Sequence, residues 1–471
     1  MQNILFLTNS ELGQCNVAFA VAEEFLRRGK FRVHFASFSP LAERVDRLSE
    51  RVSDAQRVTF HQIWGPSMTD LAVRTNVGLL HHRPGIQGAM QGFQKVRKAM
   101  SSWTPSEYGK AFQSCLDILE SVCPAVVVVD PILHVGLDAC YTINVRLVVL
   151  WPVPLKDVVI MSQPNGGLFW KYPITGSGYP FPLPWTLILS NIYLAFCAAF
   201  ALMFSKSSPD KKSSAAHEHT SRTPFPLQNA YQKNSLNLTP AFREMDFPFF
   251  IPDNVISCGP IIRECEPLSE SDPELDAWLK WPTVLISLGS HVKPEEKVAI
   301  EMAKGIQIIL EKHCPNIQIL WKLRYDWEGS EEFKKVLGPA ITAGSVRVVS
   351  WIESDIMSVL ETGQVVTYVH HGGANSYFEA CKVGIPQVVL PQWLDTYDCA
   401  TRVEWLGIGV QGSRKAAPDI DAIEFSNAVL RVLHDDRICT RSLAIKNLCQ
   451  YTEGRVVAHD HIAEYALKNF N

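Results

Sequence analysis

The stretch VTYVHHGGANSYFEACKVGIPQVVLPQWLDTYDCATRVEWLGIGV, residues 366–410, decides the fold of this chain. An apolar run that has the character of a strand comes first, and a turn with two glycines follows it. Asn375 and Ser376 then open a predicted helix, which ends at Gly384, a common C-terminal helix signal. Pro386 starts the next apolar run. This strand–helix–strand unit predicts a parallel sheet of an α/β protein.

The same alternation runs through both halves of the chain. In the first half, the predicted helices at about 16–28, 41–51 and 94–122 separate the apolar strands NILFL, FRVHFAS, AVVVVD and RLVVLW. In the second half the strands are TVLISL, IQILWKL, VRVVSWI, QVVTYV and PQVVL. We therefore predict two doubly wound, Rossmann-like domains in tandem, with a ligand cleft between them.

The predicted domain limits follow from where the alternation stops and returns. We place the N-terminal domain at residues 1–250, a linker at 251–275 and the C-terminal domain at 276–471, with the last helix packing back on the N-terminal domain.

Composition excludes several classes of protein. The chain has 471 residues, of which 47% are hydrophobic and 20% charged, as in globular proteins with substantial cores. The net charge of −4 gives no reason to expect a nucleic-acid partner. The twelve cysteines form no CxxC pair, so neither a zinc site nor a disulfide framework is expected. The first thirty residues lack the pattern of a signal peptide, and we expect a cytoplasmic protein.

One segment raises the question of a membrane. WTLILSNIYLAFCAAFALMF, residues 185–204, contains twenty residues without a charge, which is long enough to span a bilayer. Three alternatives stay open. The favoured one is a buried helix, the second is a helix in peripheral contact with a membrane surface, and the third is a spanning helix.

The turn at residues 370–376 has the chemistry of an anion site. The free N–H groups of the helix that follows favour an anion, and the glycines let a phosphate approach the backbone closely. His371 can donate to a phosphate oxygen, and Asp395 can accept hydrogen bonds from sugar hydroxyls. A structural alternative exists, because Ser376 and Glu379 have the spacing of a capping box.

The motif HHGGANSYFEAC…PQWLDTYD closely resembles the donor-binding signature of UDP-dependent glycosyltransferases of the family 1 type, and most of all that of fungal members. The opening LFLTNSELGQ and the strand LISLGS are consistent with this resemblance. It implies a GT-B fold, that is, two facing Rossmann-like domains with a cleft between them, and a UDP-sugar held by the C-terminal domain.

The resemblance also implies a set of donor-binding residues. They are His371, Gly373, Asn375 and Ser376 at the diphosphate, Ser290 near it, Glu379 at the ribose, Trp351 and Ser354 at the uridine, and Asp395 and Thr396 at the sugar. Two of these positions depart from the family pattern. The family often has Gln where this chain has Ser354 and Thr396, and the second departure leaves the identity of the sugar open.

The implied reaction is inverting transfer of a hexose, with glucose favoured, from the UDP-sugar to a hydroxyl group. We expect it to need neither a metal nor a cofactor. Because the acceptor half is rich in aromatic residues, the predicted acceptor is a hydrophobic small molecule or a lipid. The predicted acceptor-binding residues are Gln14, Trp170, Tyr179 and Phe181.

The residue missing from this pattern is the catalytic base. The family has a His in the first loop, where this chain has Leu12 or Gln14, although its orienting Asp is matched by Asp130. The proton could pass to His134, which would pair with Asp130 across one helical turn, or to Asp130 itself or Glu11. The acceptor could instead be acidic enough to need no strong base.

Two other functions stay open on the sequence. The chain could be a catalytically impaired UDP-sugar-binding protein at a membrane surface, which would explain the missing base. A UDP-sugar epimerase is a third and less favoured hypothesis.

Overall fold

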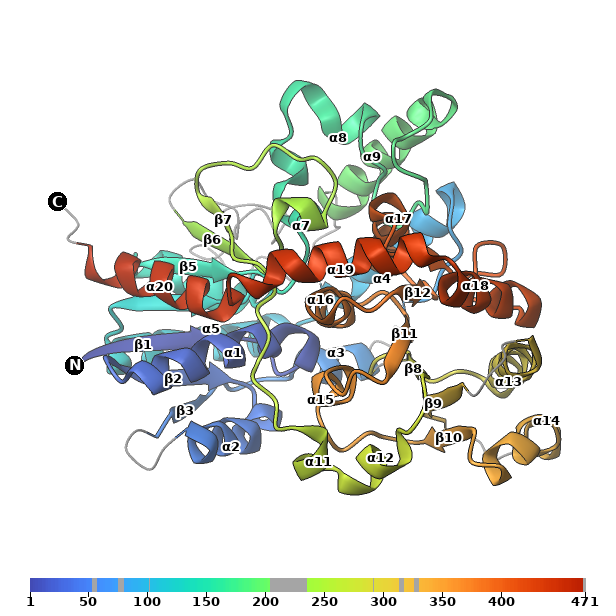
Figure 1. Cartoon of the computed structure of the whole chain (residues 1–471). Coiled ribbons are helices and arrows are strands. Elements are labelled where there is room, and N and C mark those ends of the chain that lie inside the picture. Colours follow the sequence, from blue (N-terminus) through green and yellow to red (C-terminus); the bar gives the residue numbers. More distant parts are fainter. Residues whose placement is uncertain are drawn as a thin grey trace.

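The computed structural model describes residues 1–52, 57–74, 80–100, 102–203, 235–290, 292–312, 317–325 and 330–468. Its strands form two separate sheets, one in each half of the chain, as Figure 1 shows. All strand pairs in both sheets are parallel. The predicted fold class, two Rossmann-like α/β domains, is confirmed.

The N-terminal sheet has the order β3-β2-β1-β4-β5-β6-β7. Its strands are β1 (Gln2–Leu7), β2 (Phe31–Ser37), β3 (Thr59–Gln62), β4 (Val126–Val129), β5 (Leu147–Leu150), β6 (Leu236–Thr239) and β7 (Val255–Ser257). The described helices of this half are α1 (Leu12–Arg28), α2 (Ala42–Val52), α3 (Met68–Arg74), α4 (Ile86–Met100), α5 (Pro105–Val122), α6 (His134–Thr142), α7 (Leu155–Val159), α8 (Gly167–Trp170) and α9 (Ile188–Met203). Every residue of β4 is buried, as expected for a strand covered by helices on both faces.

The C-terminal sheet has the order β10-β9-β8-β11-β12-β13. Its strands are β8 (Thr283–Ser287), β9 (Gln318–Lys322), β10 (Val346–Val349), β11 (Val365–His370), β12 (Gln387–Val389) and β13 (Gly409–Gln411). The described helices of this half are α11 (Leu268–Ser271), α12 (Pro273–Trp278), α13 (Glu296–Lys312), α14 (Glu331–Thr342), α15 (Ile356–Leu360), α16 (Ala374–Val383), α17 (Leu394–Leu406), α18 (Ala422–His434), α19 (Asp436–Gln450) and α20 (Gly454–Leu467).

Several predicted boundaries are wrong. The helix predicted at about 94–122 is two helices, α4 and α5, and α4 begins at Ile86. The N-terminal unit does not end at residue 250, because β7 pairs with β6 inside the N-terminal sheet. The predicted linker at 251–275 therefore contains a strand, and it also contains α11. The first helix starts at Leu12 and not at about residue 16, since Glu11 already has the extended backbone of an N-cap residue.

The last helix, α20, packs on the N-terminal half. Ala458 and Ile462 are fully buried in the same hydrophobic cluster as Phe25 of α1. The ring of His459 lies 4.2 Å from that of Phe25. Figure 1 shows α19 and α20 running from one half of the molecule to the other. The chain therefore crosses between its two halves a second time.

The start of α20 is pressed against the segment that joins the halves. A Cβ atom on Gly454 would lie 2.3 Å from the carbonyl oxygen of Gly259 and 2.4 Å from that of Pro260. We expect Gly454→Ala to lower the free energy of unfolding by about 1–3 kcal/mol, because backbone atoms must shift to make room. Urea denaturation measures the change. Gly109→Ala is the control, since nothing lies within 4 Å of its added Cβ inside helix α5. That control should be neutral or slightly stabilising, and an equal loss in both variants would contradict the prediction.

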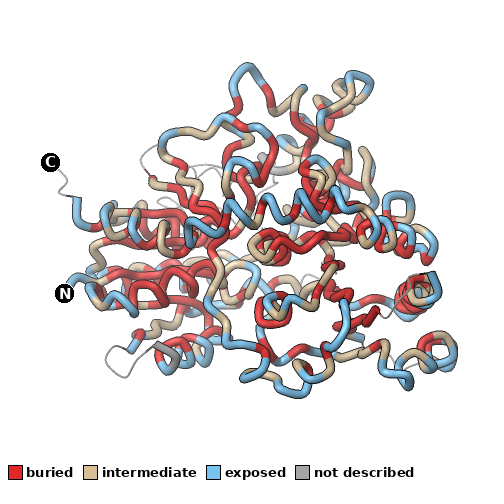
Figure 2. The backbone as a smooth tube through the Cα atoms, viewed as in Figure 1, coloured by how far each residue is buried: buried red, intermediate tan, exposed pale blue. Residues whose placement is uncertain are grey.

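Helix α9 is only half covered. Asn191, Leu194 and Ala195 are buried, and α9 packs against α4 and α8. The opposite side, with the turn that precedes the helix, exposes a row of large apolar side chains: Trp185, Leu189, Tyr193, Phe196 and Phe200. Figure 2 shows how exposed and buried residues are distributed over the backbone. The favoured expectation of a purely buried helix is therefore wrong. Phe204, the last residue of the predicted segment, lies outside the described residues. Within the described part of the chain, no helix has the length and apolar character needed to cross a membrane.

Candidate functional site

The turn between β11 and α16 is built around one histidine ring. Gly373 is the N-cap residue of α16, and no side chain caps this helix end within the described residues. The amide groups of the first turn are therefore available to an anion. A Cβ atom on Gly289 or on Gly373 would lie 2.6 or 2.7 Å from Cε1 of His371. Glycine at both positions makes the space in which the His371 ring lies.

The predicted capping box at residues 376–379 is wrong. Since α16 begins at Ala374, Ser376 is already its third residue and does not occupy the N-cap position. The Ser376 side chain is buried, and its hydroxyl group lies 3.0 Å from the hydroxyl of Tyr368. Asn375, its neighbour in the first turn, is half-buried at the mouth of the site.

Trp351, one of the two residues predicted to bind the uridine, lies beside two cationic side chains that were not predicted from the sequence. Trp351 follows β10 and is 38% exposed. Lys322 Nζ lies 4.4 Å from the centre of its ring, and Arg324 Cζ lies 5.6 Å from it. The only sequence signal for these cations is their place at the end of strand QILWK. The Ser354 hydroxyl is buried and has no hydrogen-bond partner among the described residues.

Burial perturbs the charges of this cluster. Loss of water lowers the pKa of Lys322 to about 8. Burial raises the pKa of Glu379 to about 7, with a further contribution from the charge of Asp355. Ser290, in the loop after β8, is joined to the cluster because its carbonyl accepts a hydrogen bond from Arg324. The structure thus brings Trp351, Glu379 and Ser290 to one end of the sheet.

The predicted sugar residues have different surroundings. The Thr396 side chain is buried, and its hydroxyl accepts hydrogen bonds from the backbone N–H groups of Gln392 and Trp393, each at 2.9 Å. It therefore organises the start of α17. Asp395 is exposed by area, but it lines a narrow cavity whose walls displace water and raise its pKa to about 6.

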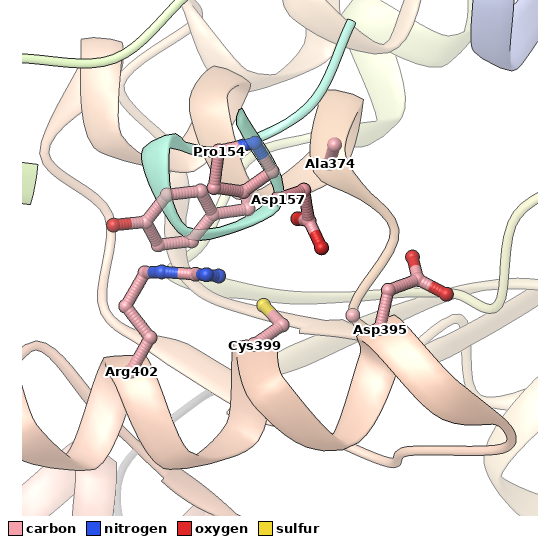
Figure 3. Close-up of a pocket in the computed structure, with 8 residues that line it drawn as sticks. Pro154, Asp157, Ala374, Asp395, Cys399 and Arg402 are labelled. Carbon is pink, nitrogen blue, oxygen red and sulfur yellow. The ribbon is translucent and has the colours of Figure 1, made fainter. Parts of the chain in front are cut away.

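That cavity lies between the two halves and exposes a carboxylate that the sequence analysis missed. Asp157 of α7 lines it from the N-terminal half, facing the residues of the C-terminal half (Figure 3). Burial and the charge of Asp398 raise the pKa of Asp157 to about 7. The available sequence signal was its position after the end of β5, at the edge of the sheet where ligands bind.

The proposed pair of Asp130 and His134 does not form. Helix α6 begins at His134, so the two residues do not share a helical turn. Asp130 Oδ2 accepts hydrogen bonds from the backbone and side-chain nitrogens of Asn9, at 3.2 and 3.0 Å, and Oδ1 accepts one from the Ile132 N–H. His134 Nε2 is buried without a partner among the described residues, and burial lowers the pKa of His134 to about 4.

Glu11 is the third predicted catalytic group. It is buried just before α1, and Oε1 accepts hydrogen bonds of 2.8 Å from both the N–H and the hydroxyl of Thr69. Its other oxygen, Oε2, is buried and has no hydrogen-bond partner among the described residues.

The predicted acceptor residues do not form one cluster. Gln14 is half-buried in the first turn of α1. Trp170 is 47% exposed, and its Nε1 donates to the carbonyl of Asn165 at 3.0 Å. Phe181 packs in an aromatic cluster with Tyr172, Phe247 and Trp405. Packing between the halves is therefore the role that the structure gives Phe181.

Tyr179, the last predicted acceptor residue, also lies at the junction of the halves. It is half-buried, and its carbonyl accepts a hydrogen bond of 3.2 Å from the hydroxyl of Thr401 in α17.

Two buried ion pairs hold the halves together beside the cavity. Lys156 Nζ lies 2.6 Å from Asp398 Oδ2, and the two side chains are 1% and 4% exposed. Arg402 Nε lies 2.8 Å from Asp246 Oδ1, and these side chains are 1% and 0% exposed. Each pair joins a residue of the N-terminal half to one of α17.

Comparison with known proteins agrees with this architecture. The family described as UDPGT, UDP-glucoronosyl and UDP-glucosyl transferase, matches residues 189–444. Glycosyltransferase sdnJ of Sordaria araneosa is 35% identical over 96% of each chain. The human 2-hydroxyacylsphingosine 1-beta-galactosyltransferase is 24% identical over 45% of this chain and 36% of its own. A UDP-glucosyltransferase from Polygonum tinctorium, solved in a complex, has the same fold, with a TM-score of 0.66, 14% identity and 99% of each chain covered. The chain belongs to the UDP-glycosyltransferase family described as UDPGT and has its GT-B fold.

Proposed function

We propose that the protein transfers a hexose, with glucose favoured, from a UDP-sugar to a hydroxyl group of a hydrophobic small molecule or a lipid, with inversion at the anomeric carbon. The observation that carries this proposal is the order of residues along one edge of the C-terminal sheet. All its strands are parallel, so the loops that follow them lie at the same edge. From β10 towards β12, these loops present Trp351, then Ser290 and His371, then Asp395.

This spatial order matches the order of parts in a UDP-sugar. An aromatic face suits the uracil ring, the start of α16 with His371 suits the diphosphate, and a carboxylate suits the hydroxyls of the sugar. This order in space differs from the order along the chain, in which Ser290 comes before Trp351, His371 and Asp395.

The same residues can stabilise the departing UDP. Negative charge develops on the leaving diphosphate, next to His371 and the free amides of α16. On this proposal the reaction needs neither a metal nor a cofactor, because these groups carry the charge. Direct attack by the acceptor oxygen from the opposite face inverts the anomeric carbon.

Glu11 is the proposed proton acceptor. Among the three candidates, Asp130 has both oxygens engaged, and His134 is poorly basic because of its lowered pKa. Glu11 keeps one oxygen without a hydrogen-bond partner among the described residues.

A second candidate function is UDP-sugar binding without catalysis. It is favoured by the absence of a histidine from the first turn of α1, which contains Leu12 and Gln14. The two functions share the donor site and differ only in the acceptor step.

The decisive experiment begins with calorimetric titration of the purified protein with UDP, UDP-glucose, UDP-galactose and UDP-N-acetylglucosamine. Binding with a preference among the sugars supports the donor site and identifies the donor. A panel of hydrophobic alcohols and phenols then separates the two functions, because only the transferase forms a glycoside. If neither UDP nor any of the three UDP-sugars binds, both functions are overturned.

The relative named for transfer to a hydroxyacylsphingosine supports a lipid-like acceptor class, and the exposed row on α9 supports peripheral contact with a membrane. We expect the protein to sediment with phosphatidylcholine–phosphatidylserine vesicles. The double variant Leu189→Glu, Phe196→Glu should bind them about tenfold more weakly or worse, since each side chain loses its apolar burial. Val73→Glu, at a side chain that is 77% exposed on α3, is the control. Equal sedimentation of all three proteins would rule out this contact.

A further inference from the structure

The narrow cavity between the halves lies at the sugar end of the proposed donor site. Its walls include Gly372 and Ala374 of the anion-binding turn and Asp395 of α17. From the opposite side, Asp157 of the N-terminal half projects into the same space. In Figure 3 the carboxyl group of Asp157 points toward the side of the cavity that Cys399 and Asp395 of the C-terminal half line.

The Asp157 carboxylate is attracted by the charges of Arg402 and Lys156, but these contacts leave its hydrogen-bonding capacity unused. Its backbone N–H donates to the carbonyl of Pro154 at 3.2 Å. The carboxylate itself forms no hydrogen bond with any described residue, whereas its neighbour Lys156 is paired with Asp398. A carboxylate that borders a cavity in this way is suited to accept hydrogen bonds from a ligand.

One nitrogen of a buried cation in the same wall also lacks a hydrogen-bond partner among the described residues. Arg402 is 1% exposed, and its Nε donates to Asp246. Its Nη2 is buried and has no hydrogen-bond partner among the described residues. Buried guanidinium donors are costly when unsatisfied, so this atom calls for an oxygen acceptor in the cavity. A ligand with several hydroxyl groups can supply both the acceptor for Arg402 and the donors for the carboxylates.

The charges around the cavity exclude some ligands. Among the described residues around it, four carboxylates, Asp157, Asp246, Asp395 and Asp398, interact with two cations, Lys156 and Arg402. Burial raises the pKa values of Asp157 and Asp395, and the negative charge of Asp398 raises both further. An additional anion in this space would be repelled, and a neutral polyol would not.

We propose that Asp157 is a donor-sugar ligand supplied by the N-terminal half, which accepts hydrogen bonds from hexose hydroxyls opposite Asp395 and selects a neutral hexose over a uronic acid. The inference rests on the proposed function, because it assigns the sugar end of the same donor site. Since Asp157 and Asp395 come from different halves, the sugar moiety contacts both halves.

The test is calorimetric titration of Asp157→Asn with UDP, with the UDP-hexose that binds the wild-type protein most tightly, and with UDP-glucuronic acid. Affinity for UDP should stay within about twofold of wild type, because the nucleotide lies on the other side of the anion turn. Affinity for the UDP-hexose should fall about tenfold, the loss expected for one hydrogen bond to a charged group. The ratio of UDP-glucuronic acid affinity to UDP-hexose affinity should rise, since one repelling charge is gone.

Controls separate the ligand role from other roles. Asp253→Asn makes the same change at an exposed carboxylate and should alter none of the three affinities. Thermal unfolding checks that Asp157→Asn folds, and Asp157→Ser is a second variant if it does not.

Unchanged UDP-hexose affinity, even with a reduced rate of transfer, would overturn the proposal in favour of proton transfer. An equal loss for UDP and UDP-hexose would overturn it in favour of a structural role. Absence of UDP binding to the wild-type protein would instead remove the proposed function itself.

Discussion

His371→Ala is expected to lower kcat/KM for sugar transfer by about 10²–10³-fold, the usual effect of removing one donor aimed at developing negative charge. The ring occupies a space that Gly289 and Gly373 keep open at the start of α16. Its loss leaves the amides of α16 in place but removes a side-chain donor from the diphosphate. Steady-state kinetics with the UDP-sugar and acceptor found by screening measure the effect.

The control for this prediction is His461→Ala, which removes a half-buried histidine from α20. Its activity should equal that of the wild type. The melting temperature of His371→Ala should stay close to that of the wild type, because the ring lies in a loop. Transfer at the wild-type rate by a folded His371→Ala protein would refute the donor assignment.

Asp398→Asn is expected to lower the free energy of unfolding by about 3–5 kcal/mol, since it leaves a buried charge on Lys156 without its partner. The lysine side chain is 1% exposed and its ammonium group lies 2.6 Å from Asp398. The hydroxyl of Thr175, which donates to the same carboxylate oxygen at 2.8 Å, gives little compensation because it carries no charge. Urea denaturation followed by fluorescence measures the loss.

Two further variants test the physical cause. Glu331→Gln removes the acid of an exposed ion pair with Lys334, whose side chains are 92% and 62% exposed, and should change stability by less than about 1 kcal/mol. The double variant Lys156→Met, Asp398→Leu should recover much of the loss, because neither charge is then buried alone. A double variant as unstable as Asp398→Asn would show that packing, and not the unpaired charge, is responsible.

The fold was predictable because its signals are local. Runs such as AVVVVD and TVLISL have the continuous apolar character of buried parallel strands, and the structure has β4 and β8 there. The errors lie at element ends. Helix α1 begins at Leu12, after the N-cap residue Glu11, and so starts about four residues earlier than predicted. The spacing of Ser376 and Glu379 suggested Ser376 as the N-cap of α16, but Gly373 has that position.

The placement of the proposed donor residues at one edge of the C-terminal sheet was predictable, since they follow strands of a single parallel sheet. The catalytic pair was not. Asp130 and His134 are four residues apart, but the turn between them is not helical, and Asn9 from the first loop bonds Asp130 instead.

Asp157 escaped the sequence analysis for a different physical reason. Its neighbours in the cavity, Asp395 and Arg402, are more than two hundred residues away in the chain, and no local pattern encodes a meeting of two domains. The same holds for Phe181, which was assigned to the acceptor as an aromatic residue of the right half. Its contact with Trp405 arises only when the halves pack.

The docking of α20 on α1 makes the N-terminal half a discontinuous unit. Its described parts are the strands and helices from β1 to β7 and the segment Gly454–Leu467, which follows the whole C-terminal sheet in the chain. Recombination with a relative at a single crossover between the sheets would therefore pack α1 of one parent against α20 of the other. The contacting residues Phe25 and His459 would then come from different parents. A hybrid protein that exchanges N-terminal halves needs two crossovers, the second just before Gly454, so that α20 comes from the same parent as the surface it covers.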